Sequence, residues 1–159
     1  MTDSHLQTLC KKISRQLMTA MFAFMAATLS YAEDETKMST VTLDIQNVAS
    51  TVGSFYIAVY NSKATFLGEE RLVGKVVPVA EVTTAGVASV DIDVPFGELA
   101  IVIHHDDNDN KKMDANFIGI PKEPVAMSNQ HVPRFGPPKY KKAKILIDQP
   151  VMKHSFTLD

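Results

Sequence analysis

The sequence predicts an all-β fold: an antiparallel two-sheet sandwich of about seven strands, similar to an immunoglobulin or transthyretin domain. From Ser39 onward, apolar Val41, Leu43 and Ile45 alternate with polar residues, which is typical of a half-buried strand. Later apolar runs are short and end in turn residues, and no stretch after residue 38 has a convincing amphipathic helical pattern. Short strands at this spacing favour two packed antiparallel sheets.

The strands follow one another along residues 39–159, which we assign to a single domain. The expected strands are 39–46, 55–60, 72–80, 88–94, 98–105, 143–148 and 151–158. Pro78 places the third strand at a sheet edge or a bulge, because proline cannot donate a ladder hydrogen bond. The apolar run Leu99 to Ile103 indicates a buried central strand.

The first 32 residues resemble an export signal. Lys11, Lys12 and Arg15 precede an apolar stretch from Leu17 to Leu29, and Ser30-Tyr31-Ala32 offers a cleavage site. That stretch is shorter than the ~20 residues needed to span a bilayer, although a short uncleaved anchor is the alternative. We therefore expect a signal peptide at 1–32, a mobile leader at 33–38, no transmembrane segment after processing, and a periplasmic or secreted protein.

The cysteine content and the charge balance limit the classes of function that this protein can have. The single cysteine, Cys10, lies within the predicted signal, so the mature chain would contain no disulfide, which suits an oxidising compartment. Removing residues 1–32 leaves 13 basic and 17 acidic residues, a balance that argues against nucleic-acid binding.

A cluster of oxygen-bearing side chains follows the central strand directly. Asp106, Asn108, Asn110 and Asp114 have the spacing D-x-N-x-N-x-x-x-D. Calcium-binding loops use side-chain oxygens at positions 1, 3, 5 and 9 and a backbone carbonyl at position 7, here Lys112. We expect a structural Ca²⁺ site made by these five residues, with Glu123 as the nearest further carboxylate.

The match to a calcium loop has two flaws. Lys111 stands where a glycine usually makes the sharp turn, so it would need a left-handed conformation, and Phe117 stands where a glutamate usually binds. The alternative is a plain turn in which Asp and Asn side chains bond their own backbone.

The long stretch from Phe117 to Tyr140 supports a different function. Beside it runs Lys139-x-Lys141-Lys142-x-Lys144. These lysines could protect an edge strand from pairing with another chain. They could instead, together with residues 117–140, form a binding module for envelope carbohydrate, lipid or protein.

No catalytic constellation is visible. Ser128 lacks a G-x-S-x-G context, and Asp106 with Glu123 as a hydrolytic carboxylate pair is less favoured than two ligands or solvated groups. His104 and His105 are neighbours on one strand, so they face opposite ways, and we expect a structural histidine that bonds the loop. We therefore expect no enzyme.

Several motifs, in order, resemble the exported bacterial family known as domain of unknown function 2141. They are Gly53, Ala58-Val59-Tyr60-Asn61-Ser62, Phe66, Pro95-Phe96-Gly97, the His105–Asp114 loop, Gly119-Ile120-Pro121-Lys122-Glu123, Ser128-Asn129, Gly136-Pro137-Pro138-x-Tyr140 and Ala143. The resemblance implies a small exported β-sandwich without an assigned activity. Members usually have glycines in the acidic loop where this chain has Asp109 and Lys111.

Overall fold

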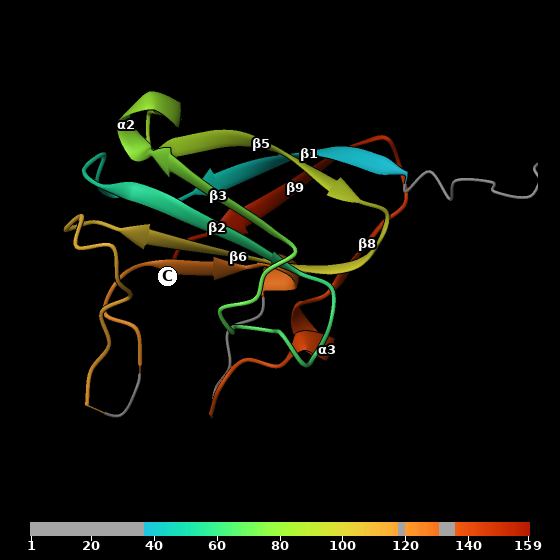
Figure 1. Cartoon of the computed structure of the whole chain (residues 1–159). Coiled ribbons are helices and arrows are strands. Elements are labelled where there is room, and N and C mark those ends of the chain that lie inside the picture. The colour runs from blue at the N-terminus through green and yellow to red at the C-terminus, as the bar shows by residue number, and fades with distance from the viewer. Residues whose placement is uncertain (1–36, 118–119, 131–135) are drawn as a thin grey trace, which may run out of the picture. The chain divides into compact units, whose positions relative to one another are not determined.

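Two β-sheets pack face to face in the computed structural model, which describes residues 37–117, 120–130 and 136–159 (Figure 1). The described residues belong to one compact unit, Thr36–Asp159. The strands are β1 (Met38–Gln46), β2 (Ser54–Tyr60), β3 (Val73–Pro78), β4 (Thr83–Thr84), β5 (Val87–Pro95), β6 (Gly97–Asp106), β7 (Val125–Met127), β8 (Ile145–Ile147) and β9 (Val151–Thr157). The predicted all-β sandwich is confirmed. The predicted signal peptide, 1–32, and leader residues 33–36 lie outside the described residues.

One sheet has the strand order β4-β5-β1-β9. Strand β1 lies between β5 and β9. Its inward side chains, Val41, Leu43 and Ile45, are fully buried, as their alternation predicted. On the outer face, the Thr40 and Thr42 hydroxyl groups each donate a 2.7 Å hydrogen bond, to Asp93 and Asp91 of β5 respectively. Met38, placed in the leader by the sequence, is the first residue of β1.

Strand β9 corrects the expectation of purely antiparallel pairing. It runs parallel to β1, with Val41 opposite Met152 and Ile45 opposite Phe156. The preceding strand, β8, pairs with β6 in the other sheet, so the chain crosses between sheets before β9 begins. Such a crossover allows a parallel pair, which a tight hairpin does not.

The second sheet has the order β3-β2-β6-β7, and β8 also pairs with β6. Strand β6 is central, as its apolar run predicted, and its residues 99–106 are all buried. Strand β3 lies at the edge, one of the two places that Pro78 predicted, but it ends at Pro78 and does not reach the expected residue 80. The core between the sheets centres on large, fully buried side chains that include Phe55, Leu99, Ile101 and Phe156.

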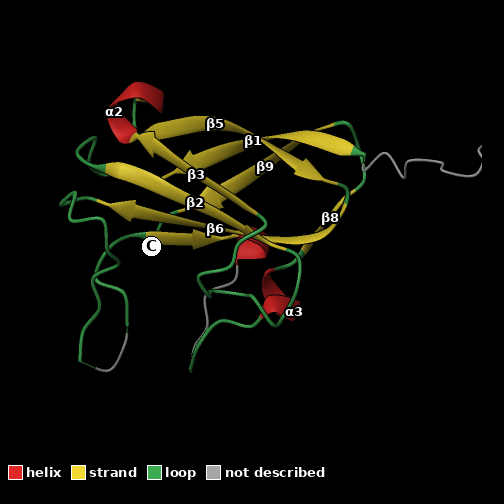
Figure 2. Cartoon of the chain, in the orientation of Figure 1, coloured by secondary structure: helices red, strands yellow, loops and turns green. Residues whose placement is uncertain are grey.

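The predictions from the sequence did not include two short strands, and they placed one lysine run wrongly. Strands β4 and β7 were not expected, and Val79–Val82 and Tyr140–Ala143 form single helical turns, α2 and α3 (Figure 2). Lys141 and Lys142 lie in α3 rather than on an edge strand. No helix in the described ranges is long and apolar enough to cross a membrane.

Candidate functional site

The first candidate ligand, Asp106, is the last residue of strand β6 and lies at the end of the second sheet. Asp106 pairs with Ser54 of β2 and is fully buried. Gly53 precedes that partner at φ +78°, and a Cβ atom placed there would lie 1.8 Å from the Asp106 carbonyl oxygen. The strand can therefore end against this segment only because residue 53 is a glycine. The sequence contained Gly53 but gave no sign of this contact.

The loop folds back around the Asp106 carboxylate. Oδ1 accepts a hydrogen bond from the Asn110 backbone N–H (3.2 Å), and Oδ2 accepts one from the Lys111 N–H (2.8 Å). Asp109 and Lys111 take the left-handed conformation, at φ 57° and 64°. The prediction for the Lys111 backbone is confirmed, and it carries a strain that glycine would avoid.

The two asparagines and Asp114 converge. Asn108 Nδ2 and Asn110 Nδ2 both donate to Asp114 Oδ2, at 2.8 Å and 3.0 Å. Their Oδ1 atoms accept backbone N–H groups, from Asn110 (3.0 Å) and Lys112 (2.8 Å) respectively. These are the bonds of successive Asx turns, so the loop is already closed by its own side chains.

Glu123 lies beneath the loop, where the sequence placed a further carboxylate. Its Oε2 accepts the Asp114 N–H (2.8 Å) and contacts His104 Nε2 at 2.7 Å. Glu123 is only 5% exposed, and its Oε1 is buried without a hydrogen-bond partner among the described residues. A buried carboxylate oxygen costs free energy unless a donor or a cation satisfies it.

The structure thus gathers Asp106, Asn108, Asn110 and Asp114 into one bonded loop, with Glu123 attached to it through Asp114. Lys112, at position 7 of the loop, joins through its N–H group. Within the described ranges, no three His, Cys, Asp or Glu side chains form a group that could hold a metal ion. The expected Ca²⁺ set also needs two amide oxygens and a backbone carbonyl, so the metal site stays a prediction.

The two histidines at this end of the sheet face opposite ways, as expected. His105 is buried against Phe55, with ring centroids 5.1 Å apart, and its Nε2 lies 2.9 Å from the Val52 carbonyl oxygen. His104 faces the other way, beside Tyr56 and Glu123. Sequence reasoning missed the His104–Glu123 pair, because residues 19 positions apart have no periodic relation that could reveal it.

Ser128 is structural. Its hydroxyl group donates to the Ala143 carbonyl oxygen and accepts the Ile101 N–H (2.9 Å), so it ties α3 to β6.

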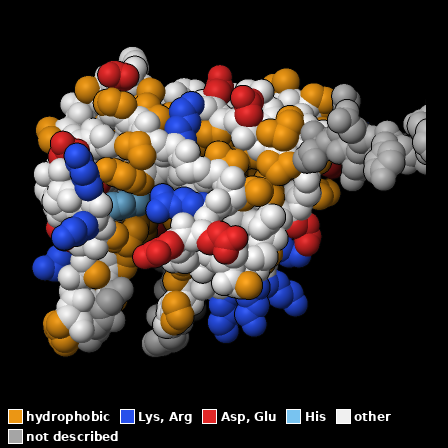
Figure 3. Space-filling model, in the orientation of Figure 1, with side chains coloured by type: hydrophobic (Ala, Val, Ile, Leu, Met, Phe, Trp, Pro, Cys, Tyr) orange, Lys and Arg blue, Asp and Glu red, His pale blue; other side chains and the backbone are white. Residues whose placement is uncertain are grey.

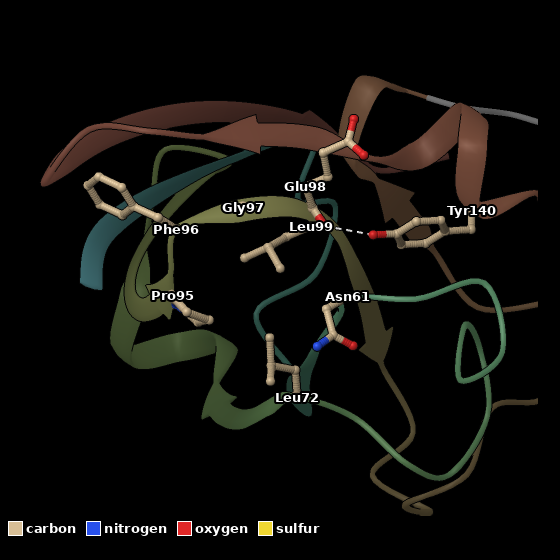
Figure 4. A pocket seen from close by; sticks show the side chains of 8 residues that line it. All are labelled: Asn61, Leu72, Pro95, Phe96, Gly97, Glu98, Leu99 and Tyr140. Carbon is tan, nitrogen blue, oxygen red and sulfur yellow. Dashed lines mark hydrogen bonds between the residues drawn. The ribbon is translucent and has the colours of Figure 1, made fainter. Parts of the chain in front are cut away.

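A second candidate site is an open pocket of about 570 Å³ at the other end of β6 (Figure 4). It is lined by Asn61, Leu72, Pro95, Phe96, Gly97, Glu98, Leu99 and Tyr140. The Tyr140 hydroxyl group donates to the Glu98 carbonyl oxygen (2.6 Å), and the Glu98 carboxylate pairs with Lys144 (2.5 Å). Burial raises the pKa of Tyr140, Glu98 raises it further, and Lys144 opposes them. The carboxylate among the pocket's lining residues is that of Glu98.

Comparison with known proteins gives a family but no characterised relative. No curated protein and no solved structure matches the chain. A family model, described as "Uncharacterized protein conserved in bacteria (DUF2141)", matches residues 43–155, from β1 into β9. The match covers most of the chain and both sheets, including the loop built on Asp106. The chain therefore belongs to the DUF2141 family of bacterial proteins.

Proposed function

We propose that this chain is an exported, non-enzymatic β-sandwich protein in which the loop after β6 binds Ca²⁺ as a structural ion. The proposed ligands are oxygens of Asp106, Asn108, Asn110 and Asp114, the Lys112 carbonyl and Glu123. The ion would fix the loop and the segment that follows it, and would take no part in a reaction.

The observation that carries this proposal is the buried carboxylate of Glu123. It is attached to the loop through the Asp114 N–H, yet Oε1 has no partner within the part of the chain that the structure describes. Asp106, also buried, is satisfied only by backbone N–H groups in the bonds found. Glu123 contacts His104, but neither carboxylate pairs with a lysine or arginine in the described residues. A divalent cation would compensate this charge.

Four carboxylates in the loop add a second reason. Asp106, Asp107, Asp109 and Asp114 lie within nine residues of chain, and like charges at short range destabilise one another. The amide oxygens of Asn108 and Asn110 would have to turn from backbone N–H groups toward the ion. That cost, with the strained Lys111, predicts weak binding, with Kd on the order of 10⁻⁴–10⁻³ M.

The test is thermal unfolding of the purified chain in EDTA and in 1 mM Ca²⁺. With a Kd of about 0.1 mM, linkage gives about 1.4 kcal/mol, or roughly 3–5 °C in Tm. Asp114→Asn should remove the shift while keeping a hydrogen-bond acceptor for the two asparagines. Asp91→Asn on β5 removes the same charge outside the loop and should keep the shift. Equal Tm values for the parent chain in both solutions would contradict the proposal and favour the plain turn.

A further inference from the structure

The segment after the acidic loop forms a small hairpin that projects away from the sandwich. Ala115 and Pro121 form a bridge, and the Asn116 N–H donates to the Ile120 carbonyl oxygen (2.8 Å). At its base, the Lys122 N–H donates to the Asp114 carbonyl oxygen (2.8 Å). Figure 1 shows this segment extending from the end of β6, away from both sheets.

Two apolar residues of this hairpin, one on each side of the undescribed residues 118–119, are open to solvent. Phe117 is 98% exposed and Ile120 is 54% exposed. Scattered exposed apolar residues are ordinary, but a phenylalanine that is almost fully exposed on a projecting hairpin has no packing role in the sandwich. Ala115 to Lys122 contains no acidic residue. The carboxylates of the preceding loop therefore lie on the chain before the hairpin rather than at its end.

Basic residues accompany the apolar hairpin. Pro124 to Ile147 contains Arg134 and four lysines and not one acidic residue, although the whole chain has a net charge of −2. Six exposed lysines belong to the acidic loop, to the hairpin base, and to α3 with its flank: Lys111, Lys112, Lys122, Lys139, Lys141 and Lys142. In the described part of the chain, none of the six forms an ion pair, whereas Lys144 is paired with Glu98.

These two features face the same way. In Figure 3, the lysine side chains over α3 and the apolar end of the hairpin reach the same lower edge of the molecule. A flat surface brought against that edge would meet apolar groups and ammonium groups together.

We propose that this edge docks on an anionic phospholipid bilayer, with Phe117 and Ile120 entering the interface and the lysines contacting lipid phosphates. An aromatic side chain at the interface gains apolar contact, and juxtamembrane lysines are attracted to the negative surface. A soluble anionic polymer would engage the lysines but offers no apolar layer for Phe117. The bilayer therefore accounts for both features. This proposal does not require the calcium site.

The absence of tryptophan from the chain allows a local test. Phe117→Trp places one fluorophore at the hairpin end, and Val87→Trp places one on β5, where Val87 is 38% exposed. The full chains are mixed with vesicles of phosphatidylcholine and phosphatidylglycerol, with brominated lipid as quencher. We expect a blue shift and quenching for Phe117→Trp but not for Val87→Trp. A local probe is necessary because the apolar stretch 17–29 could itself attach the chain to vesicles.

The lysines are tested in the Phe117→Trp background. Lys141→Gln with Lys142→Gln should weaken vesicle binding by up to about thirtyfold at low salt, since each lysine near an anionic surface contributes about fivefold. Lys75→Gln with Lys153→Gln removes the same charge elsewhere and should have little effect. Vesicles of phosphatidylcholine alone, or 0.5 M NaCl, should reduce quenching.

Three results would overturn the proposal. One is a Phe117→Trp spectrum that does not change with anionic vesicles in either EDTA or Ca²⁺. The second is equal quenching of the Val87→Trp chain. The third combines two observations: a soluble polyanion displaces the chain fully from the vesicles, and the Phe117→Ser variant binds that polyanion as tightly as the parent chain does. Together they would indicate a polyanion site. With bilayer docking, Phe117→Ser should weaken vesicle binding about tenfold.

Discussion

The core between the sheets and the loop end of β6 are stabilised by different physical effects. In the core, apolar side chains such as Leu43, Ile101 and Phe156 are fully removed from water. At the loop end, the buried groups include Asp106, Glu123 and His105, and hydrogen bonds satisfy most of their polar atoms. Burial of apolar area is non-directional, whereas each polar contact requires one atom at one place.

This difference determines how each region responds to change. The core should lose stability in proportion to the volume removed, regardless of ions in solution. The loop end depends on charge and backbone conformation, so small changes there should have effects of either sign. The following substitutions test that contrast, with Tm and urea unfolding as the measurements.

The largest expected effect is in the core. Phe156→Ala should lower the free energy of unfolding by about 3–5 kcal/mol, because Phe156 is fully buried and the truncation leaves a cavity. The loss should be the same in EDTA and in Ca²⁺. Val151→Ala, on the same strand but 71% exposed, should change stability by less than about 0.5 kcal/mol. A loss at Phe156 below about 1 kcal/mol would mean that β9 packs less tightly than the structure indicates.

Gly53→Ala should have the next largest effect. The left-handed backbone alone costs an alanine about 1–2 kcal/mol, and its Cβ would collide with the Asp106 carbonyl oxygen at 1.8 Å. The substitution should therefore destabilise the protein and displace the start of the acidic loop. Gly74→Ala is the matched control, because its nearest neighbour is the flexible Arg71 side chain at 3.4 Å and its φ is not left-handed. Equal Tm changes for the two variants would contradict the close approach at residue 53.

The same contrast between the apolar core and the polar loop end explains how much of each region the sequence predicts. Alternation at Val41, Leu43 and Ile45 predicts both the strand β1 and the face that it buries, because the side-chain period of a strand is two. The parallel register of β9 has no comparable signal, since β1 and β9 are more than 100 residues apart. Strand β7 has only three residues, too few for a pattern.

The loop end was predictable only in part. The spacing from Asp106 to Asp114 identified the cluster, and the position of Lys111 indicated its left-handed backbone. The contact of His104 with Glu123, and of Gly53 with Asp106, depends on how β2, β6 and the hairpin base are placed in space. No spacing in the chain encodes these contacts.

The smallest expected effect has the opposite sign. Lys111→Gly should raise the free energy of unfolding by roughly 0.5–1 kcal/mol: glycine removes about 1–2 kcal/mol of left-handed strain, and its greater unfolded-state entropy takes back part of that gain. Lys112→Gly is the control, because Lys112 has no left-handed backbone and should lose stability instead. Each variant loses one lysine charge, so the two variants differ in the backbone conformation of the substituted residue. If both variants were stabilised equally, the left-handed backbone of residue 111 would not explain the gain, and its strain would contribute nothing measurable.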